Sequence, residues 1–138
     1  MIVIPETGSF ILDSGLVISS RTTRSEFLGS PEGASSSALV RNEPWCSFKW
    51  AIPSESLTAV VFFKGEAIQF LQIAVTSDSS TSWNEEAELR RKNENDNWLR
   101  GKGLAAGSTY AWGSVWSDYD PKSGSSTAVV KFSNGVPP

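Results

Sequence analysis

The chain has 138 residues, 39% of them hydrophobic, and its 15 acidic and 12 basic residues leave a net charge of −3. A chain of this length folds as one ordinary domain and hides roughly two-thirds of the surface of its unfolded state. We therefore predict a single domain over residues 1–138. Binding to nucleic acid needs a concentrated positive field, which this charge balance lacks. We accordingly expect no nucleic-acid partner.

The chain contains no histidine and one cysteine, Cys46. These counts exclude Ser-His-Asp and Cys-His catalytic arrangements, histidine-based zinc sites and thiolate metal cages. They also exclude an internal disulfide, so nothing in the sequence requires an oxidising compartment. No signal-peptide pattern opens the chain, and no apolar run approaches the roughly 20 residues that cross a bilayer. We expect a cytoplasmic, non-enzymatic protein with no metal, no cofactor and no membrane partner.

The first third of the chain carries turn and helix signals. Residues 10–18 hold two short apolar runs around an Asp-Ser-Gly turn, a pattern typical of a hairpin. Thr23 and Glu26 have capping-box spacing, and a Gly-Ser-Pro run follows them, which predicts a short helix over about residues 24–29. The Gly- and Ser-rich residues 32–37 are predicted to form a flexible loop.

Residues 38–75 have the pattern of a β-meander. Residues 46–52 alternate apolar and polar side chains, which is the period of a half-buried strand. Residues 57–63 are apolar on both faces and predict an interior strand. In residues 67–75 the apolar positions change phase after Phe70, which fits either a sheet covered on both faces or a β-bulge that resets the register. We favour covered faces, because the helices must pack somewhere.

A long charged stretch predicts the main helix. Ser82 and Glu85 have capping-box spacing, and a Gly-rich end follows, so we place the helix at about residues 83–100. Its buried stripe is thin and includes Trp98. The neighbouring Asp96 is expected to pair with Lys92 at i,i+4 spacing.

The last segment predicts a hairpin. Tyr110, Trp112 and Trp116 share one strand phase, and an Asp-Pro-Lys-Ser-Gly turn precedes an alternating strand. The fold class is therefore predicted to be α+β: an antiparallel sheet of about five to seven strands, with one main helix (about 83–100) and one short helix (about 24–29).

The candidate site residues are aromatic and acidic. Trp45 falls on the strand phase opposite to Trp50, so the two indoles cannot both face one core. An aromatic side chain on the wet face of a sheet marks a binding surface, which makes Trp45 and Trp116 candidate partner-binding residues, although large aromatics also fill cores. Glu43 and Asp118 are acidic neighbours that would steer association with a partner.

Three stretches carry a resemblance to known proteins. They are RTTRSEFLGSP (21–31), SWNEEAELRRKNENDNWLRGKG (82–103) and YAWGSVWSDYDPKSGSS (110–126). They resemble a group of small uncharacterised bacterial proteins of similar length and order of elements. That pattern has a histidine where this chain has Asn95, so no acid–base role carries over to this position. The resemblance itself carries over no activity. Small, acidic, single-domain bacterial proteins without catalytic motifs are often immunity or antitoxin proteins, and this association makes such a role the expectation.

These observations leave three functional hypotheses. The leading one is a non-enzymatic protein-binding module, an immunity- or antitoxin-type inhibitor that captures a basic toxin partner with an acidic, aromatic surface. The alternative is a small enzyme or ligand-binding domain that uses Asp or Glu in a pocket between sheet and helix. A third is a subunit that pairs through an exposed sheet edge. A flat patch with exposed tryptophan would favour the first, and converging carboxylates in a deep pocket the second.

Overall fold

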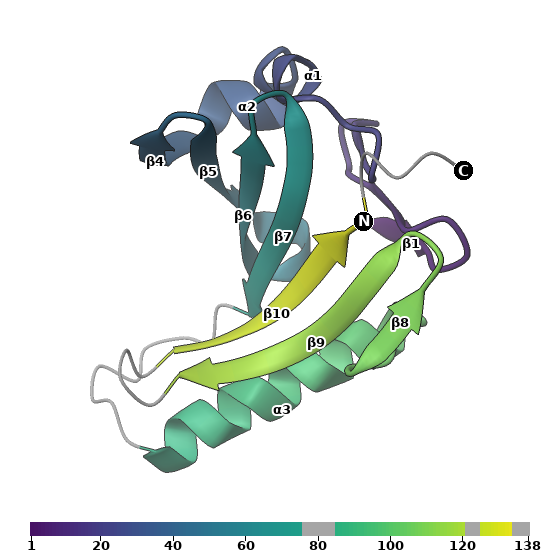
Figure 1. Cartoon of the computed structure of the whole chain (residues 1–138). Helices are drawn as coiled ribbons and strands as arrows, with labels where there is room; N and C mark the ends of the chain where they lie inside the picture. Colours follow the sequence, from purple (N-terminus) through teal and green to yellow (C-terminus); the bar gives the residue numbers. More distant parts are fainter. Residues whose placement is uncertain (76–84, 121–124, 134–138) are drawn as a thin grey trace.

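The computed structural model describes residues 1–75, 85–120 and 125–133, and leaves the side chains of residues 75, 85–92, 118–120 and 125–126 undescribed. Within these residues the chain forms a seven-stranded antiparallel sheet, a three-stranded antiparallel sheet and three α-helices (Figure 1), which confirms the predicted α+β class. The seven-stranded sheet is called the large sheet below, and the three-stranded one the small sheet.

The strands of the large sheet, in spatial order, are β4 (Ser37–Asn42), β5 (Trp45–Ile52), β6 (Leu57–Lys64), β7 (Ala67–Val75), β10 (Ser125–Phe132), β9 (Gly113–Asp120) and β8 (Ser108–Tyr110). The small sheet contains β1 (Ile2–Ile4), β2 (Ser9–Ile11) and β3 (Val17–Ile18). The helices are α1 (Arg24–Leu28), α2 (Pro31–Ser35), α3 (Glu85–Gly101) and the 3-10 helix η1 (Pro53–Glu55).

The local signals near the start of the chain form the predicted elements. The hairpin is present as β2 and β3, in which Phe10 pairs with Ile18. The capping box of α1 is complete: the Thr23 hydroxyl accepts from the Glu26 amide, and the Glu26 carboxylate accepts from the Thr23 amide. These two elements depend on neighbouring residues alone, which is why the sequence predicts them.

The prediction of a loop at residues 32–37 was wrong, because α2 and the start of β4 occupy this segment. Ser30 caps α2 by accepting from the Gly33 amide at 3.0 Å, and Pro31 takes the first helical position, where its missing N–H costs nothing. A Cβ at Gly33 would lie 2.0 Å from the Phe27 carbonyl oxygen, so glycine lets α2 pack against the end of α1. Pro31, which follows the end of α1 closely, is therefore the first residue of α2.

The meander from β4 to β7 is confirmed, and β6 is an interior strand between β5 and β7. The expectation that both faces of β7 are covered was wrong. Phe62 pairs with Phe70, but Phe63 pairs with Ile68, so Gln69 is an extra residue and forms a β-bulge. The bulge keeps Ile68 on the same buried face as the later apolar residues of β7 and turns Phe70 to the other face.

The final hairpin is confirmed by the pairing of β9 with β10, and its predicted tip at residues 121–124 lies outside the described residues. The common phase predicted for its aromatic residues was wrong, because Tyr110 ends β8 and a turn separates it from β9. Trp112 lies in this turn and is buried, and its indole Nε1 donates to the Pro5 carbonyl at 2.7 Å. Trp116 follows on β9 and is half-buried.

Helix α3 ends where it was predicted to end, and its predicted cap at Ser82 lies outside the described residues. The helix packs along β10, β9 and β7 (Figure 1). Among its described side chains Leu99 is fully buried, whereas Trp98 is half-buried at the border of the core. Asp96 accepts a hydrogen bond from the Ser117 hydroxyl on β9, and its predicted partner Lys92 has an undescribed side chain.

A polar network around Glu55 joins the end of α3 to η1. Glu55 Oε1 lies 2.9 Å from Lys102 Nζ and accepts from the Trp98 indole at 3.2 Å. Burial alone would raise the pKa of Glu55, but the hydrogen bonds from Lys102 and Trp98, with the Lys102 charge, lower it below its ordinary value of 4.5. The ionised carboxylate therefore favours the folded state.

Replacing Leu99 by Ala should destabilise the protein by about 2 to 5 kcal/mol, because the change leaves a cavity between α3 and the sheet. The matched control is Leu39→Ala, since Leu39 is 55% exposed on β4 and its truncation should cost within about 0.5 kcal/mol. Urea unfolding followed by far-UV circular dichroism measures both. Similar losses for the two variants would mean that α3 is not docked through Leu99.

Lowering the pH should remove the stabilisation that Glu55 provides. A carboxylate with a lowered folded-state pKa stabilises fully above its unfolded value, here 4.5, and loses this contribution as the pH falls through the folded value. The stability difference between wild type and Glu55→Gln should thus be largest near pH 7 and shrink below pH 4.5. Urea unfolding from pH 7 to pH 3 measures it, with the exposed Glu6→Gln as control. A pH-independent difference would contradict this role.

Candidate functional site

The large sheet has one face that packs against the helices and the small sheet, and one face that no described element covers. One face of the sheet from β5 to β9 packs against the helices and the small sheet, and its side chains form the hydrophobic core, whereas every residue of β4 is exposed. No described element covers the opposite face, which is turned toward the viewer in Figure 1 and is called the open face below. Its described side chains include Val40, Trp45, Ser47, Lys49, Val60, Phe62, Lys64, Phe70, Gln72, Ser114, Trp116, Val129 and Lys131. Of these, Ser47 and Val129 are buried by their neighbours.

The register of the sheet places five of these residues in one row across the strands. Lys49 on β5 lies opposite Val60 on β6, which lies opposite Gln72 on β7. Gln72 in turn lies opposite Val129 on β10, and Val129 lies opposite Trp116 on β9. Directly opposite side chains on one face of an antiparallel sheet are in contact range. The row therefore forms a continuous surface that ends in the Trp116 indole.

A second row runs beside the first. Phe62 and Phe70 lie opposite each other, with ring centroids 6.2 Å apart and planes at 90°. Phe70 also lies opposite Lys131 on β10, and Ser47 flanks Phe62 on β5. The bulge at Gln69 is what brings Phe70 to this face. Both phenylalanines remain half-buried and accessible to solvent.

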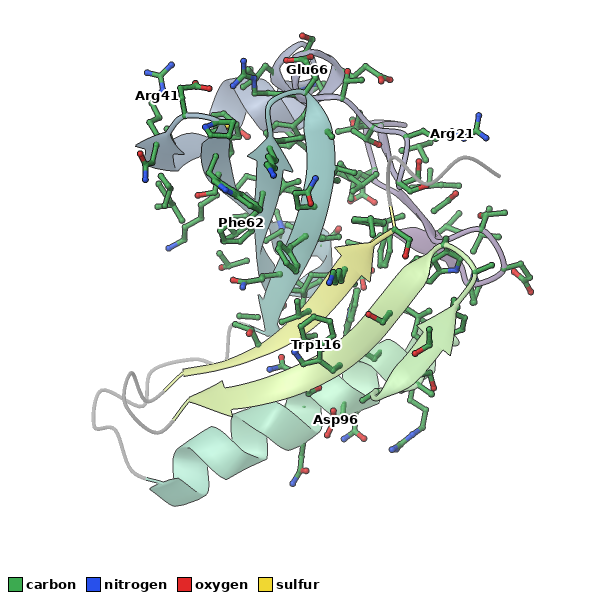
Figure 2. The ribbon with its side chains drawn as sticks, in the orientation of Figure 1. Arg21, Arg41, Phe62, Glu66, Asp96 and Trp116 are labelled. Atoms are coloured by element: carbon green, nitrogen blue, oxygen red, sulfur yellow. The ribbon has the colours of Figure 1, made fainter. Side chains whose placement is uncertain are left out.

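The two tryptophans predicted as partner-binding residues lie on the same face but not together. Trp45 is 37% exposed, and Lys64 opposite it holds its Nζ 5.9 Å from the centroid of the indole ring. Trp116 lies on β9, four strand spacings across the sheet, or about 19 Å, and its row meets β5 at Lys49, four residues along the strand from Trp45. Figure 2 shows Trp116 and Phe62 on this side of the sheet. The tryptophans thus mark the two ends of one surface.

The acidic residues predicted beside them are placed differently. Glu43 precedes Pro44 in the turn between β4 and β5, and its exposed carboxylate pairs with Arg24 at 3.6 Å. Arg24 also contacts Glu66 at 3.2 Å. Asp118 lies on β9 opposite Thr127, and its side chain is outside the described part. The charge of Glu43 is therefore balanced locally.

Sequence reasoning missed the middle of the open face. Phe62 and Phe70 belong to strands that are apolar on both sides, so no local pattern says which of their side chains face solvent. The lysines Lys49, Lys64 and Lys131 were likewise taken as ordinary polar positions. The alternation in residues 46–52 is the one signal that places Lys49 on the face opposite to the core.

A hollow of ≈ 310 Å³ between α2 and β5 bears on the alternative of a catalytic pocket. Its carboxylates are already engaged: Asp13 accepts from the Ser54 hydroxyl at 2.5 Å, and Glu32 accepts from the Ser14 hydroxyl at 2.6 Å. The Ser54 hydrogen bond is the main cause that lowers the pKa of Asp13, which suits a permanently ionised group and not a general acid.

The indole of Trp50 also lines this hollow. Its Nε1 is closed off from solvent and has no acceptor among the described residues, so it is not offered to a ligand. Within the described part of the chain, no group of three or more Cys, Asp or Glu side chains is arranged to hold a metal ion. The hollow therefore lacks converging free catalytic groups among its described residues.

Comparisons with protein-family models, with curated proteins and with solved structures found no match. None of the described helices combines the length and the apolar character that a bilayer span requires. The functional argument accordingly depends on the geometry and chemistry of the open face.

Two tryptophans on opposite faces of β5 should respond differently to truncation. Trp50 is 4% exposed and packs against Phe27 at a ring distance of 5.0 Å, so Trp50→Ala should cost about 3 to 5 kcal/mol. Trp45→Ala should cost less than about 1 kcal/mol, because this indole is 37% exposed and lies outside the hydrophobic core. Urea denaturation of both variants measures the difference. Equal losses would show that Trp45 belongs to the core.

Proposed function

We propose that the protein is a non-enzymatic protein-binding module, an immunity- or antitoxin-type inhibitor that covers a toxin partner with the open face. The observation that carries this proposal is the uncovered aromatic and aliphatic surface between Trp45 and Trp116. Monomeric proteins rarely leave a contiguous apolar surface in water without a partner for it. Tryptophan is also the residue type most enriched among side chains that dominate binding energy.

The size of the open face fits the centre of a protein interface. Five neighbouring strands, in the spatial order β5, β6, β7, β10 and β9, span about 19 Å across the sheet. An eight-residue strand extends about 26 Å along it. The resulting area of about 500 Å² is a large part of the roughly 800 Å² that each partner buries in a standard complex. A flat sheet face of this kind can block an active site by covering it, without any reaction of its own.

The residues have separate roles in this proposal. Trp45 and Trp116 are the anchors at the two ends, and Val60, Phe62 and Phe70 form the apolar centre between them. Glu43 and Asp118 lie at strand ends, where charge affects the rate of association more than the final affinity. The alternative, a small enzyme or ligand-binding domain, would instead depend on Asp13 or Glu32 in the hollow beside α2.

Trp116→Ala and Trp45→Ala should weaken binding while leaving the fold stable. The immobilised protein is used to capture a partner from a lysate of the cells that produce it, and affinities are then measured by surface plasmon resonance. Each truncation should cost about 2 kcal/mol, or roughly a 30-fold rise in Kd, with a small change in melting temperature. The matched control is Ile2→Ala, since Ile2 is 65% exposed but lies on the small sheet, and it should bind as wild type does.

Two results would count against the proposal. Unchanged affinity in both tryptophan variants would remove the open face as the binding surface. Turnover of a substrate by the purified protein, abolished by Asp13→Asn or Glu32→Gln, would replace the proposal by the enzyme alternative.

A further inference from the structure

Three lysines stand among the apolar residues of the open face. Lys131 lies directly opposite Phe70, and Lys64 lies opposite Trp45. Lys49 occupies the same kind of position opposite Val60 in the neighbouring row. Lysine covers apolar surface with its methylene stem while its ammonium group stays in water. The positive charges therefore belong to the proposed binding surface itself and not to its surroundings.

No described acidic side chain of the open face pairs with these charges; Asp118 and Asp120, whose side chains lie outside the described part, occupy the same strand phase of β9 as Trp116. Among the described side chains of the open face there is no Asp or Glu, and neither Lys49 nor Lys131 forms an ion pair with a described residue. Two cations elsewhere are paired: Lys102 lies 2.9 Å from Glu55, and Arg24 pairs with two glutamates. The chain as a whole is acidic, with a net charge of −3. The described open face is thus locally positive on a negative protein.

The charge of the open face decides which kind of partner surface can approach it. A basic partner surface would have to bury or crowd three uncompensated ammonium groups, and juxtaposed like charges cost several kcal/mol. Carboxylates would instead meet Lys49, Lys64 and Lys131 around the apolar centre and would gain both rate and specificity. Because the lysines are spread from β5 to β10, an extended acidic surface fits this arrangement better than one isolated acid.

We propose that the surface bound by the open face is an acidic protein surface, with carboxylates that pair with Lys49, Lys64 and Lys131 around an apolar centre. This inference rests on the proposed protein-binding function and adds the chemistry of the partner. It differs from the expectation of a basic partner, which was drawn from the net charge of the chain.

Single-stranded nucleic acid is the other macromolecule that could bind lysines and aromatic side chains on an open sheet. Its phosphates would contact the lysines, and its bases would stack on the aromatic rings. Protein is favoured because Phe62 and Phe70 pack edge to face at 90°, so these rings cover each other and do not present two parallel stacking platforms.

Association kinetics with the captured partner test the inference. The wild-type association rate should fall about tenfold between 50 and 500 mM NaCl, because opposite charges steer the encounter. Lys49→Glu and Lys131→Glu should each slow association by about tenfold at low salt and reduce its salt dependence. Lys131→Gln should have an intermediate effect. The control is Arg21→Glu, the same charge reversal at an exposed position away from the open face (Figure 2), which should leave the rate near that of wild type.

The outcomes separate this inference from the proposed function. If Trp116→Ala weakens binding but the rate is independent of salt, or rises in Lys131→Glu, the interface stands and the acidic partner is wrong. If no protein is captured whose retention depends on Trp116, both the proposed protein-binding function and the inference of an acidic partner fail. Binding of a fluorescein-labelled 12-nucleotide oligo(dT) at 150 mM NaCl, lost in Lys131→Glu, would assign the face to nucleic acid and overturn the proposal. Melting curves of each variant confirm that the fold is intact.

Discussion

The covering of the large sheet on one face is the constraint on which the rest of the structure depends. Side chains alternate across a strand, so a sheet that packs its helices and the small sheet on one side turns every second residue to the other side. In β5 this rule separates buried Trp50 from exposed Trp45. The open face is therefore a consequence of where α1 and α3 pack, and its composition is what distinguishes this protein from an ordinary half-buried sheet.

One extra residue sets the composition of that face. Without the bulge at Gln69, the alternation of β7 would place Phe70 and Ile68 together on one side and Leu71 on the other. The bulge lets Ile68 and Leu71 share the core, and Phe70 moves out to meet Phe62 and Lys131. A bulge is also a common way to redirect a side chain near a functional surface. The apolar centre of the proposed interface thus depends on a local departure from regular pairing.

The fold also places its paired carboxylates and the lysines of the open face in different parts of the molecule. Glu55 and Glu66 are held by cations and hydrogen bonds, and the pKa of each is lowered, for Glu66 mainly by the hydrogen bond from Ser25. Such carboxylates stabilise the molecule away from the open face, while Lys49 and Lys131 stay without an ion pair among the described residues. The described side chains of the open face therefore carry positive charge, although the net charge of the chain is negative. This arrangement also argues that charge here specifies a partner and that apolar contact supplies most of the affinity.

The sequence by itself determined the elements whose signals are local: the α+β class, the hairpin before residue 18, the capping box at Thr23 and the alternation of β5. These depend on residues within a few positions of one another, so composition and spacing suffice. Tertiary structure alone decided the rest. The bulge at Gln69 and the meeting of Trp45, Trp116 and the lysines on one face each depend on a distant segment. The start of α2 at Pro31 is different, because the cap at Ser30 is a local signal that the sequence carries. A strand that is apolar on both sides cannot say which side will be covered, because that choice is made by the packing of helices far away in the chain.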